Sequence, residues 1–152
     1  MLRSKEILDA LEGMLKERFP DSEGHQDLVY KDFKRPAFLV EVGKQTMEDA
    51  TRWAVDRTAQ CRVTLFEAVD VRHNSQVEAL SDKLSLAMEL LSCAAIQVGD
   101  RFLDVSGLSG EYFNDYAEAA FTLSWQDDRE TGPVEGALAQ HYDLTVEVNK
   151  EV

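Results

Sequence analysis

Apolar and polar residues alternate one by one in three segments of the chain, at 37–42, 117–125 and 142–149. Alternation with a period of two is typical of a strand that buries one face. The apolar positions are Phe38, Val40 and Val42 in the first segment and Ala117, Ala119, Phe121, Leu123 and Trp125 in the second. We therefore expect three one-sided strands, the last of them near the C-terminus.

Two other segments repeat apolar residues every three or four positions, which is the spacing of a helix with one buried face. The first covers residues 4–18, is capped by Ser4 and ends before Pro20. The second runs from 74 to about 95 and is capped by Asn74 or Ser75. The apolar stripes consist of Ile7, Leu11, Met14 and Leu15 in the first helix and of Val77, Leu80, Leu84, Met88 and Leu91 in the second.

Turn signals organise the rest of the chain. Gly99-Asp100 and Asn114-Asp115 can both adopt the positive φ of a two-residue hairpin turn. A short strand is expected at 28–31, and the polar stretch at about 126–140 predicts an exposed loop. The element order α-β-β-β-α-β-β-β-β differs from the alternation of a parallel βα fold. We predict one α+β domain over residues 1–152, with two helices on one face of a largely antiparallel or mixed sheet.

Residues 45–60 are ambiguous. The run Thr46-Met47-Glu48-Asp49 is similar to the capped start of a helix, and local signals favour a helix slightly. Thr51, Trp53, Val55 and Arg57 alternate as in a strand. From the residues alone, both interpretations remain open.

Charge and composition exclude several function classes. The 152 residues include 29 acids and 16 bases, which gives a net charge of −13. A protein that grips a phosphate backbone needs a basic face, so we expect no sequence-specific nucleic-acid binding. No apolar run reaches the roughly 18 to 20 residues of a membrane helix, and the N-terminus lacks the apolar segment of a signal peptide. We expect no membrane association, and a protein made in the cytoplasm or built into something assembled there.

Candidate chemistry is sparse. His25, His73 and His141 lie far apart without a second ligand at helical or hairpin spacing, and no glycine-rich phosphate loop is present. Residues 106–110 lie between two expected strands, which favours a flexible loop over a nucleophile turn. The pair Asp127-Asp128 is typical of a solvated run. We expect no catalytic, cofactor-binding or metal site and no enzyme activity, and isolated Cys61 and Cys93 are expected to be buried thiols.

A basic pair, Lys34 and Arg35, leads into Pro36. Proline fixes its own φ and pushes the preceding residue into an extended conformation. Proline is tolerated in a sheet at the first residue of a strand. The junction therefore predicts a strand start with two exposed cations.

Three arginines, Arg52, Arg57 and Arg62, follow in or beside the ambiguous segment. If residues 45–68 form one long strand, Arg52 and Arg62 share a face and Arg57 takes the other. The bases are either scattered surface charge or a basic edge that contacts the acidic surface of an identical neighbour. Head-to-tail contacts of that kind close into rings when the rotation permits.

The strand expected at 142–149 presents Leu144, Val146 and Val148 on one face. It could extend the sheet of its own chain. It could equally add to the sheet edge of a neighbouring copy, because strand addition is a common docking mode.

In the order and spacing of these elements, the whole chain resembles the tail terminator proteins of long-tailed bacteriophages and prophages. The segments that carry the resemblance are Phe33-Lys34-Arg35-Pro36 with its apolar strand, Arg62-Val63-Thr64-Leu65-Phe66, the helix at 75–91, the segment 111–125 and the strand at 144–149. The resemblance implies that residues 45–68 are one long strand. The third strand carries fewer aromatic residues, and the loop after residue 125 is longer, than is usual in that family.

The resemblance also implies a structural role in the virion. Tail terminators form a ring, usually of six copies, on the head-proximal end of the tail tube. The ring stops polymerisation of the tube protein and joins the neck or capsid, so the expected partners are identical copies, the tube protein and a neck or connector protein. DNA would pass through an acidic lumen without sticking.

Other functions stay open at this stage. A neck or head-completion protein would contact the connector instead of the tube. A small enzyme or ligand-binding α+β domain would need a concave pocket with converging polar groups. A nucleic-acid-binding adaptor is disfavoured by the charge.

Overall fold

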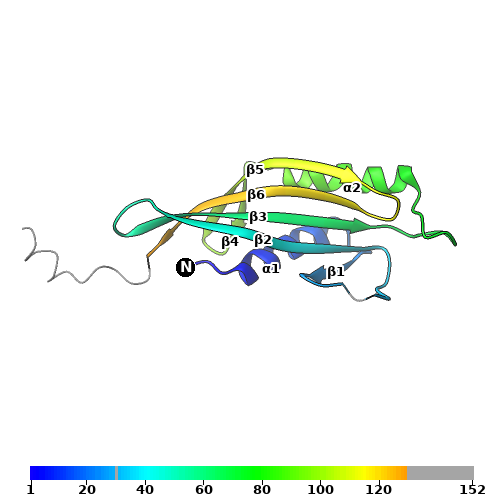
Figure 1. Ribbon diagram of the computed structural model, residues 1–152, viewed down its shortest axis with the longest axis horizontal. Coiled ribbons are helices and arrows are strands. Elements are labelled where there is room, and N and C mark those ends of the chain that lie inside the picture. The colour runs from blue at the N-terminus through cyan, green and yellow to red at the C-terminus, as the bar shows by residue number, and fades with distance from the viewer. Residues whose placement is uncertain (30, 130–152) are drawn as a thin grey trace, which may run out of the picture.

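The computed structural model describes residues 1–29 and 31–129, which form a mixed sheet with two helices against one of its faces (Figure 1). The elements are α1 (Ser4–Arg18), β1 (Glu23–Gln26), β2 (Ala37–Asp49), β3 (Ala54–Phe66), α2 (Val77–Leu91), β4 (Ala95–Val98), β5 (Arg101–Tyr112) and β6 (Ala117–Asp128). The strand order is β1-β2-β3-β6-β5-β4. Only β1 and β2 pair in parallel; the other neighbours in this sheet are antiparallel. The predicted α+β fold is confirmed.

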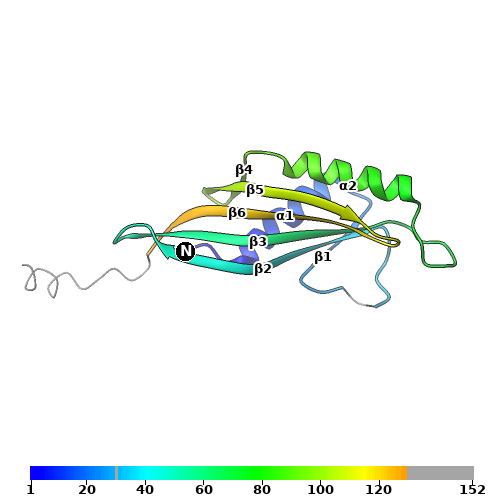
Figure 2. The ribbon, with the colours of Figure 1, turned by 45° about the horizontal axis from the view of Figure 1, so that its top comes forward.

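The core lies between the helices and the sheet. The apolar stripes predicted from the sequence are directed into it, except for Val77 at the start of α2, which is 60% exposed. Helices α1 and α2 cover the same face of the curled sheet (Figure 2). Helix α1 packs against β1, β2 and β4, whereas α2 packs against β3, β5 and β6. The fully buried helix residues include Ile7, Leu11, Leu15, Leu80 and Leu91. Among the described residues, the helices cover one face of the sheet only; we name the other face the open face.

Strand β6 confirms the clearest alternation in the sequence. Its residues from Ala117 to Trp125 at odd positions are buried in the core, while even positions face away. The pattern continues for two residues beyond the predicted strand, so Asp127 also points to the covered face. Residues 126–128 therefore belong to β6, and their assignment to an exposed loop was wrong.

Residues 45–60 form neither a helix nor part of one long strand. They belong to a hairpin, in which β2 ends at Asp49 and β3 begins at Ala54. The main-chain N–H groups of Ala50 and Thr51 both donate to the carbonyl of Ala54, at 3.2 and 3.0 Å, and close the turn. The turn contains no glycine, proline or asparagine, which explains why no sequence signal marked it.

Other boundaries also differ from expectation. The short first strand is β1, not residues 28–31, and the second helix spans fewer residues than the predicted 74–95. Residues 106–110 are not a loop, because they lie within β5 at an irregularity in its pairing with β6. Residues 130–140 of the predicted loop and the predicted strand at 142–149 lie outside the described residues.

Both predicted hairpin turns are present, but only the first has a residue with the expected positive φ. Gly99 has a φ of 64° between β4 and β5, in the left-handed region that glycine adopts without strain. Between β5 and β6, the Phe113 N–H donates to the Tyr116 carbonyl at 2.7 Å around Asn114-Asp115.

Candidate assembly surface

The open face is polar along most of its length. It is built from the strand residues whose side chains point away from the helices, and neighbouring strands place them side by side. Its central members on β2, β3 and β6 are Glu41, Thr46, Thr58, Gln60, Arg62, Glu118, Thr122 and Ser124. Most are exposed or half-buried, so this face is available for contact with another protein.

One cation lies at the centre of the open face. The Arg62 Nε donates to Glu41 Oε2 at 2.8 Å, and Arg62 Nη1 lies 3.8 Å from Glu118 Oε2. The side chain of Arg62 is 54% exposed. The hydrogen bond to Glu41 is the main reason why the pKa of Arg62 is raised above its ordinary value. The three side chains carry a net negative charge that a partner can reach.

Between the Arg62 centre and the charged pair of positions Glu48 and Asp56 near the β2–β3 hairpin, the open face has an uncharged polar stretch. Thr46 and Thr58 lie opposite each other and share a hydrogen bond between their hydroxyls. Thr58 also lies opposite Ser124, and Gln60 lies opposite Thr122. This part offers hydroxyl and amide groups that both donate and accept.

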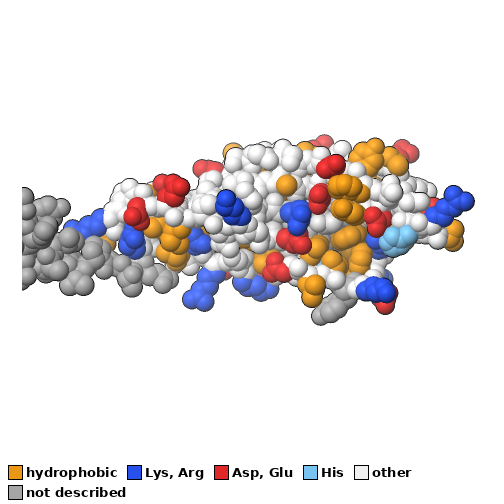
Figure 3. Space-filling model, in the orientation of Figure 1, with side chains coloured by type: hydrophobic (Ala, Val, Ile, Leu, Met, Phe, Trp, Pro, Cys, Tyr) orange, Lys and Arg blue, Asp and Glu red, His pale blue; other side chains and the backbone are white. Residues whose placement is uncertain are grey.

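The other end of the open face is apolar and aromatic (Figure 3). Phe66 packs against Phe33 and Tyr116, with ring centroids 4.6 and 6.4 Å apart, over a small cluster that includes Ala37 and Leu39. Phe33 comes from the segment between β1 and β2, which lies against the sheet here.

Arg35 is part of this aromatic end. Its guanidinium carbon lies 4.9 Å from the centroid of Phe33 and 5.2 Å from that of Phe66. Its Nη1 donates to the carbonyls of Glu67 at 3.0 Å and Asp115 at 2.8 Å. Burial lowers the pKa of Arg35, although Asp115 acts in the opposite direction. The expectation of two exposed cations was therefore wrong for Arg35, while Lys34 is exposed.

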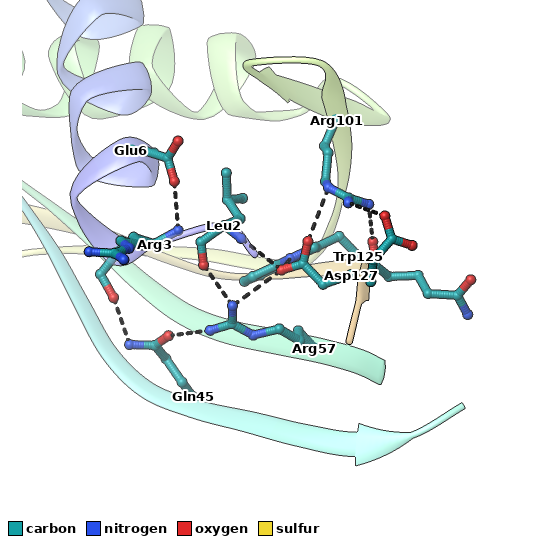
Figure 4. Close-up of polar contacts among 11 residues, drawn as sticks. Leu2, Arg3, Glu6, Gln45, Arg57, Arg101, Trp125 and Asp127 are labelled. Carbon is teal, nitrogen blue, oxygen red and sulfur yellow. Dashed lines mark hydrogen bonds and ion pairs between the residues drawn. The ribbon is translucent and has the colours of Figure 1, made fainter. Parts of the chain in front are cut away.

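Arg57 lies on the covered face, opposite in direction to Arg62, and only 9% of it is exposed (Figure 4). Its Nη1 donates to the Leu2 carbonyl at 2.6 Å and lies 3.3 Å from Asp127 Oδ2, while Nη2 donates to Gln45 Oε1 at 3.1 Å. The guanidinium carbon lies 5.0 Å from the centroid of the Trp125 ring. Arg57 is engaged within its own chain, so it was wrongly assigned to a basic edge.

Asp127 is the centre of this buried polar cluster and is fully buried. Its Oδ2 accepts from the Leu2 N–H at 2.9 Å and from Trp125 Nε1 at 3.0 Å, and Arg101 Nε lies 3.0 Å from Oδ1 (Figure 4). Burial opposes ionisation, yet the hydrogen bonds from Leu2, Trp125 and Arg57 and the charge of Arg101 lower its pKa below the ordinary value. The cluster ties the N-terminus to the end of β6.

Arg52 lies in the hairpin turn and not in a strand. It is exposed, and its guanidinium carbon lies 5.1 Å from the centroid of the half-exposed Trp53 ring. The hairpin tip therefore presents an arginine and a tryptophan to solvent. Leu144, Val146 and Val148 lie outside the described residues.

Sequence reasoning missed two buried charges. Asp127 was assigned to a solvated run, although the alternation of β6 predicts a core position once it is extended by two residues. Lys83 lies on the apolar stripe of α2, beside Leu84, and is 4% exposed. Its Nζ donates to Ser22 Oγ at 2.9 Å and to the Phe66 carbonyl at 3.0 Å, and burial lowers its pKa.

The two cysteines of the chain are free. Cys61 is buried as expected, and burial raises the pKa of its thiol to about 12. Cys93 is half-buried. Within residues 1–29 and 31–129, no group of three His, Cys, Asp or Glu side chains could hold a metal ion. None of the helices in this part of the chain is long and apolar enough to cross a membrane.

Residues 6–135 match the sequence profile of the phage tail terminator proteins. The match begins inside α1 and extends past the end of β6, so it spans nearly all of the described fold. No curated protein matches the chain.

Proposed function

Since the chain belongs to the phage tail terminator family, we propose that it caps the head-proximal end of a phage tail tube as a ring of identical copies, usually six in such proteins. A role in completing a phage tail follows from the family, which is structural and not enzymatic. In the proposal, the ring stops polymerisation of the tube protein and joins the tail to the neck or capsid of the virion, after assembly in the host cytoplasm.

The physical requirement on such a protein is two different surfaces. The end of a growing tube templates the next ring of tube protein. A terminator has to match that end with one surface and present a surface that does not propagate with the other. The open face, with its charged centre and aromatic end, and the hairpin tip with Arg52 and Trp53 differ enough in chemistry to serve separate partners.

The observation that carries the proposal is the family match over residues 6–135. The net charge of −13 supports it, because an acidic lumen repels the phosphate backbone and lets DNA pass without sticking.

Electron microscopy of the matching tail tube protein, polymerised with and without this chain, tests the proposal. We expect tubes of limited length that carry a ring at one end. Tubes of uncontrolled length with bare ends would contradict it. Rings that bind only the connector would instead assign the chain to the neck.

A further inference from the structure

The outer edge of β2 is largely unpaired. Strand β1 pairs only with Ala37–Val40 of β2, and it is the outermost strand on that side of the described sheet. From Glu41 to Asp49, β2 therefore has no strand on its side away from β3 among residues 1–29 and 31–129. A row of unpaired main-chain N–H and C=O groups is a template for a further strand.

The register shows which groups face outward. The Ala50 N–H donates to the Ala54 carbonyl, and hydrogen-bonded pairs alternate along an antiparallel ladder. By that alternation, the N–H and C=O groups of Gln45, Met47 and Asp49 point away from β3. Three alternate positions on this edge thus direct their main-chain groups toward a further strand.

The edge also carries apolar surface that nothing in the described part of the chain covers fully. Met47 lies opposite Arg57, and Val42 lies opposite Cys61, so both point to the covered face of the sheet. Met47 is 52% exposed, and Val42 is only partly buried. A strand added here would place its own apolar residues beside them.

The chain contains a segment with the required pattern. In residues 142–149, Leu144, Val146 and Val148 alternate with Asp143, Thr145 and Glu147. The length of this segment is close to that of the unpaired edge from Glu41 to Asp49. The segment lies beyond residue 135, where the family match ends.

We propose that residues 142–149 of one copy add as a strand to the β2 edge of a neighbouring copy, with Leu144, Val146 and Val148 toward Met47. The proposal rests on the ring proposed above and supplies its contact between copies. Each copy would give its segment to the next copy and accept one from the previous copy. Such a head-to-tail contact closes into a ring when the rotation permits.

The length of the connection allows the segment to reach a neighbouring copy. The Arg129 N–H donates to the Trp53 carbonyl at 2.8 Å, so the described chain ends beside the tip of the β2–β3 hairpin. From there the β2 edge is two strand spacings away, about 10 Å, which roughly three or four extended residues cover. Residues 130–141 could reach up to about 40 Å. That reach exceeds the distance to the chain's own β2 edge, so it also allows the segment to cross to a neighbouring copy.

A disulfide experiment between two variants tests the occupant directly. One full-length chain carries Met47→Cys and the other Val146→Cys, both in a Cys93→Ser background; buried Cys61 is left unchanged. Leu144→Cys and Val148→Cys replace Val146→Cys in parallel samples to cover the register. We expect a disulfide between the Met47→Cys chain and a segment variant in the mixed sample after oxidation, identified by non-reducing gel and peptide mass spectrometry. A chain with both substitutions should give a series of covalent oligomers.

Two results would overturn the proposal. A covalent monomer from the doubly substituted chain, without cross-links in the mixed sample, would place the segment on its own β2 edge. No cross-link between the Met47→Cys chain and any of the three segment variants would mean that the segment docks elsewhere.

A proline variant tests the strand addition independently of the proposed capping function. Val146→Pro removes a main-chain donor and should abolish rings in size-exclusion chromatography with light scattering, with an unchanged melting temperature. Ala137→Pro, in the connection, is the matched control and should keep the rings. Rings that persist in Val146→Pro would overturn the strand addition and leave the capping function intact. If the unaltered chain formed no rings and left tube length uncontrolled, the function itself would fail.

Discussion

Arg57 and Arg62 lie five residues apart on β3 and show how one strand serves two purposes. Arg57 is buried on the covered face of the sheet, where its partners are Leu2, Gln45 and Asp127. Arg62 is on the open face, more than half exposed, where its partners are Glu41 and Glu118. Both residues are arginines. Whether the position in the strand is odd or even decides which face of the sheet each one lies on.

The different burial of the two arginines determines which of them can interact with another protein. A buried charge that loses its partner is strongly destabilising, because water cannot replace the lost interaction. An exposed ion pair contributes little to stability, since water competes for both groups. Arg57 therefore serves the fold, whereas Arg62 can exchange its present partners for those of another protein.

The largest expected effect comes from removing the buried carboxylate partner of Arg57. Asp127→Ala leaves Arg57 buried without its carboxylate and releases the Leu2 N–H. We expect the free energy of unfolding to fall by about 3–5 kcal/mol, measured by urea denaturation. Asp128→Ala is the matched control, because Asp128 is adjacent but 87% exposed, and it should cost about 1 kcal/mol or less. Equal effects of the two substitutions would contradict the assignment of Asp127 as the structural partner.

A smaller effect is expected from protonating the same carboxyl in place. The pKa of Asp127 is lower in the native chain than in the unfolded chain, where an aspartate has a pKa of about 3.9. Its stabilising contribution is thus complete above that pH and is lost as the pH falls through the native pKa. Urea denaturation from about pH 6 down to about pH 2 should show a steeper loss of stability for the unaltered chain than for Asp127→Asn. Parallel curves for the two proteins would show that the Asp127 carboxyl is not responsible for the loss of stability at low pH.

The smallest effect on stability, and the largest on assembly, is expected at Arg62. Arg62→Ala should change the free energy of unfolding by about 1 kcal/mol or less, because the side chain is exposed. Arg62→Glu puts a third carboxylate beside Glu41 and Glu118 and should reduce tube capping, scored by electron microscopy. Ser85→Glu adds a carboxylate at an exposed position of α2, on the other side of the sheet, and should cap normally. Normal capping by Arg62→Glu would show that the region of the open face around Arg62 does not contact the tail tube.

The elements that could be predicted are those determined by sequence patterns a few residues long. The alternation in β6, the two helical stripes and the turns at Gly99-Asp100 and Asn114-Asp115 are all of this kind. The turn after β2 was missed because Ala50 to Trp53 includes none of the usual turn residues. Main-chain hydrogen bonds to Ala54 define it instead, and composition does not reveal them.

The partners of the charged residues could not be predicted in the same way. Parity correctly placed Arg57 and Arg62 on opposite faces. The sequence could not show that Asp127, 70 residues away, and Leu2, 55 residues away, converge on Arg57. That convergence depends on β3 and β6 being neighbours in the sheet, which is a property of the topology.

The central β3–β6 ladder has a consequence for how the chain folds during synthesis. Ala54 pairs with Asp128 and Leu65 with Ala117, so the paired residues are 52 to 74 positions apart in the sequence. Closing such long loops costs entropy before the contacts form, and folds that depend on distant pairings form in milliseconds to seconds instead of microseconds. The ribosome has to release β6 before the middle of the sheet can close. Until then β3 has only β2 beside it, and the nascent chain exposes a strand edge that a chaperone, or another nascent copy, can reach.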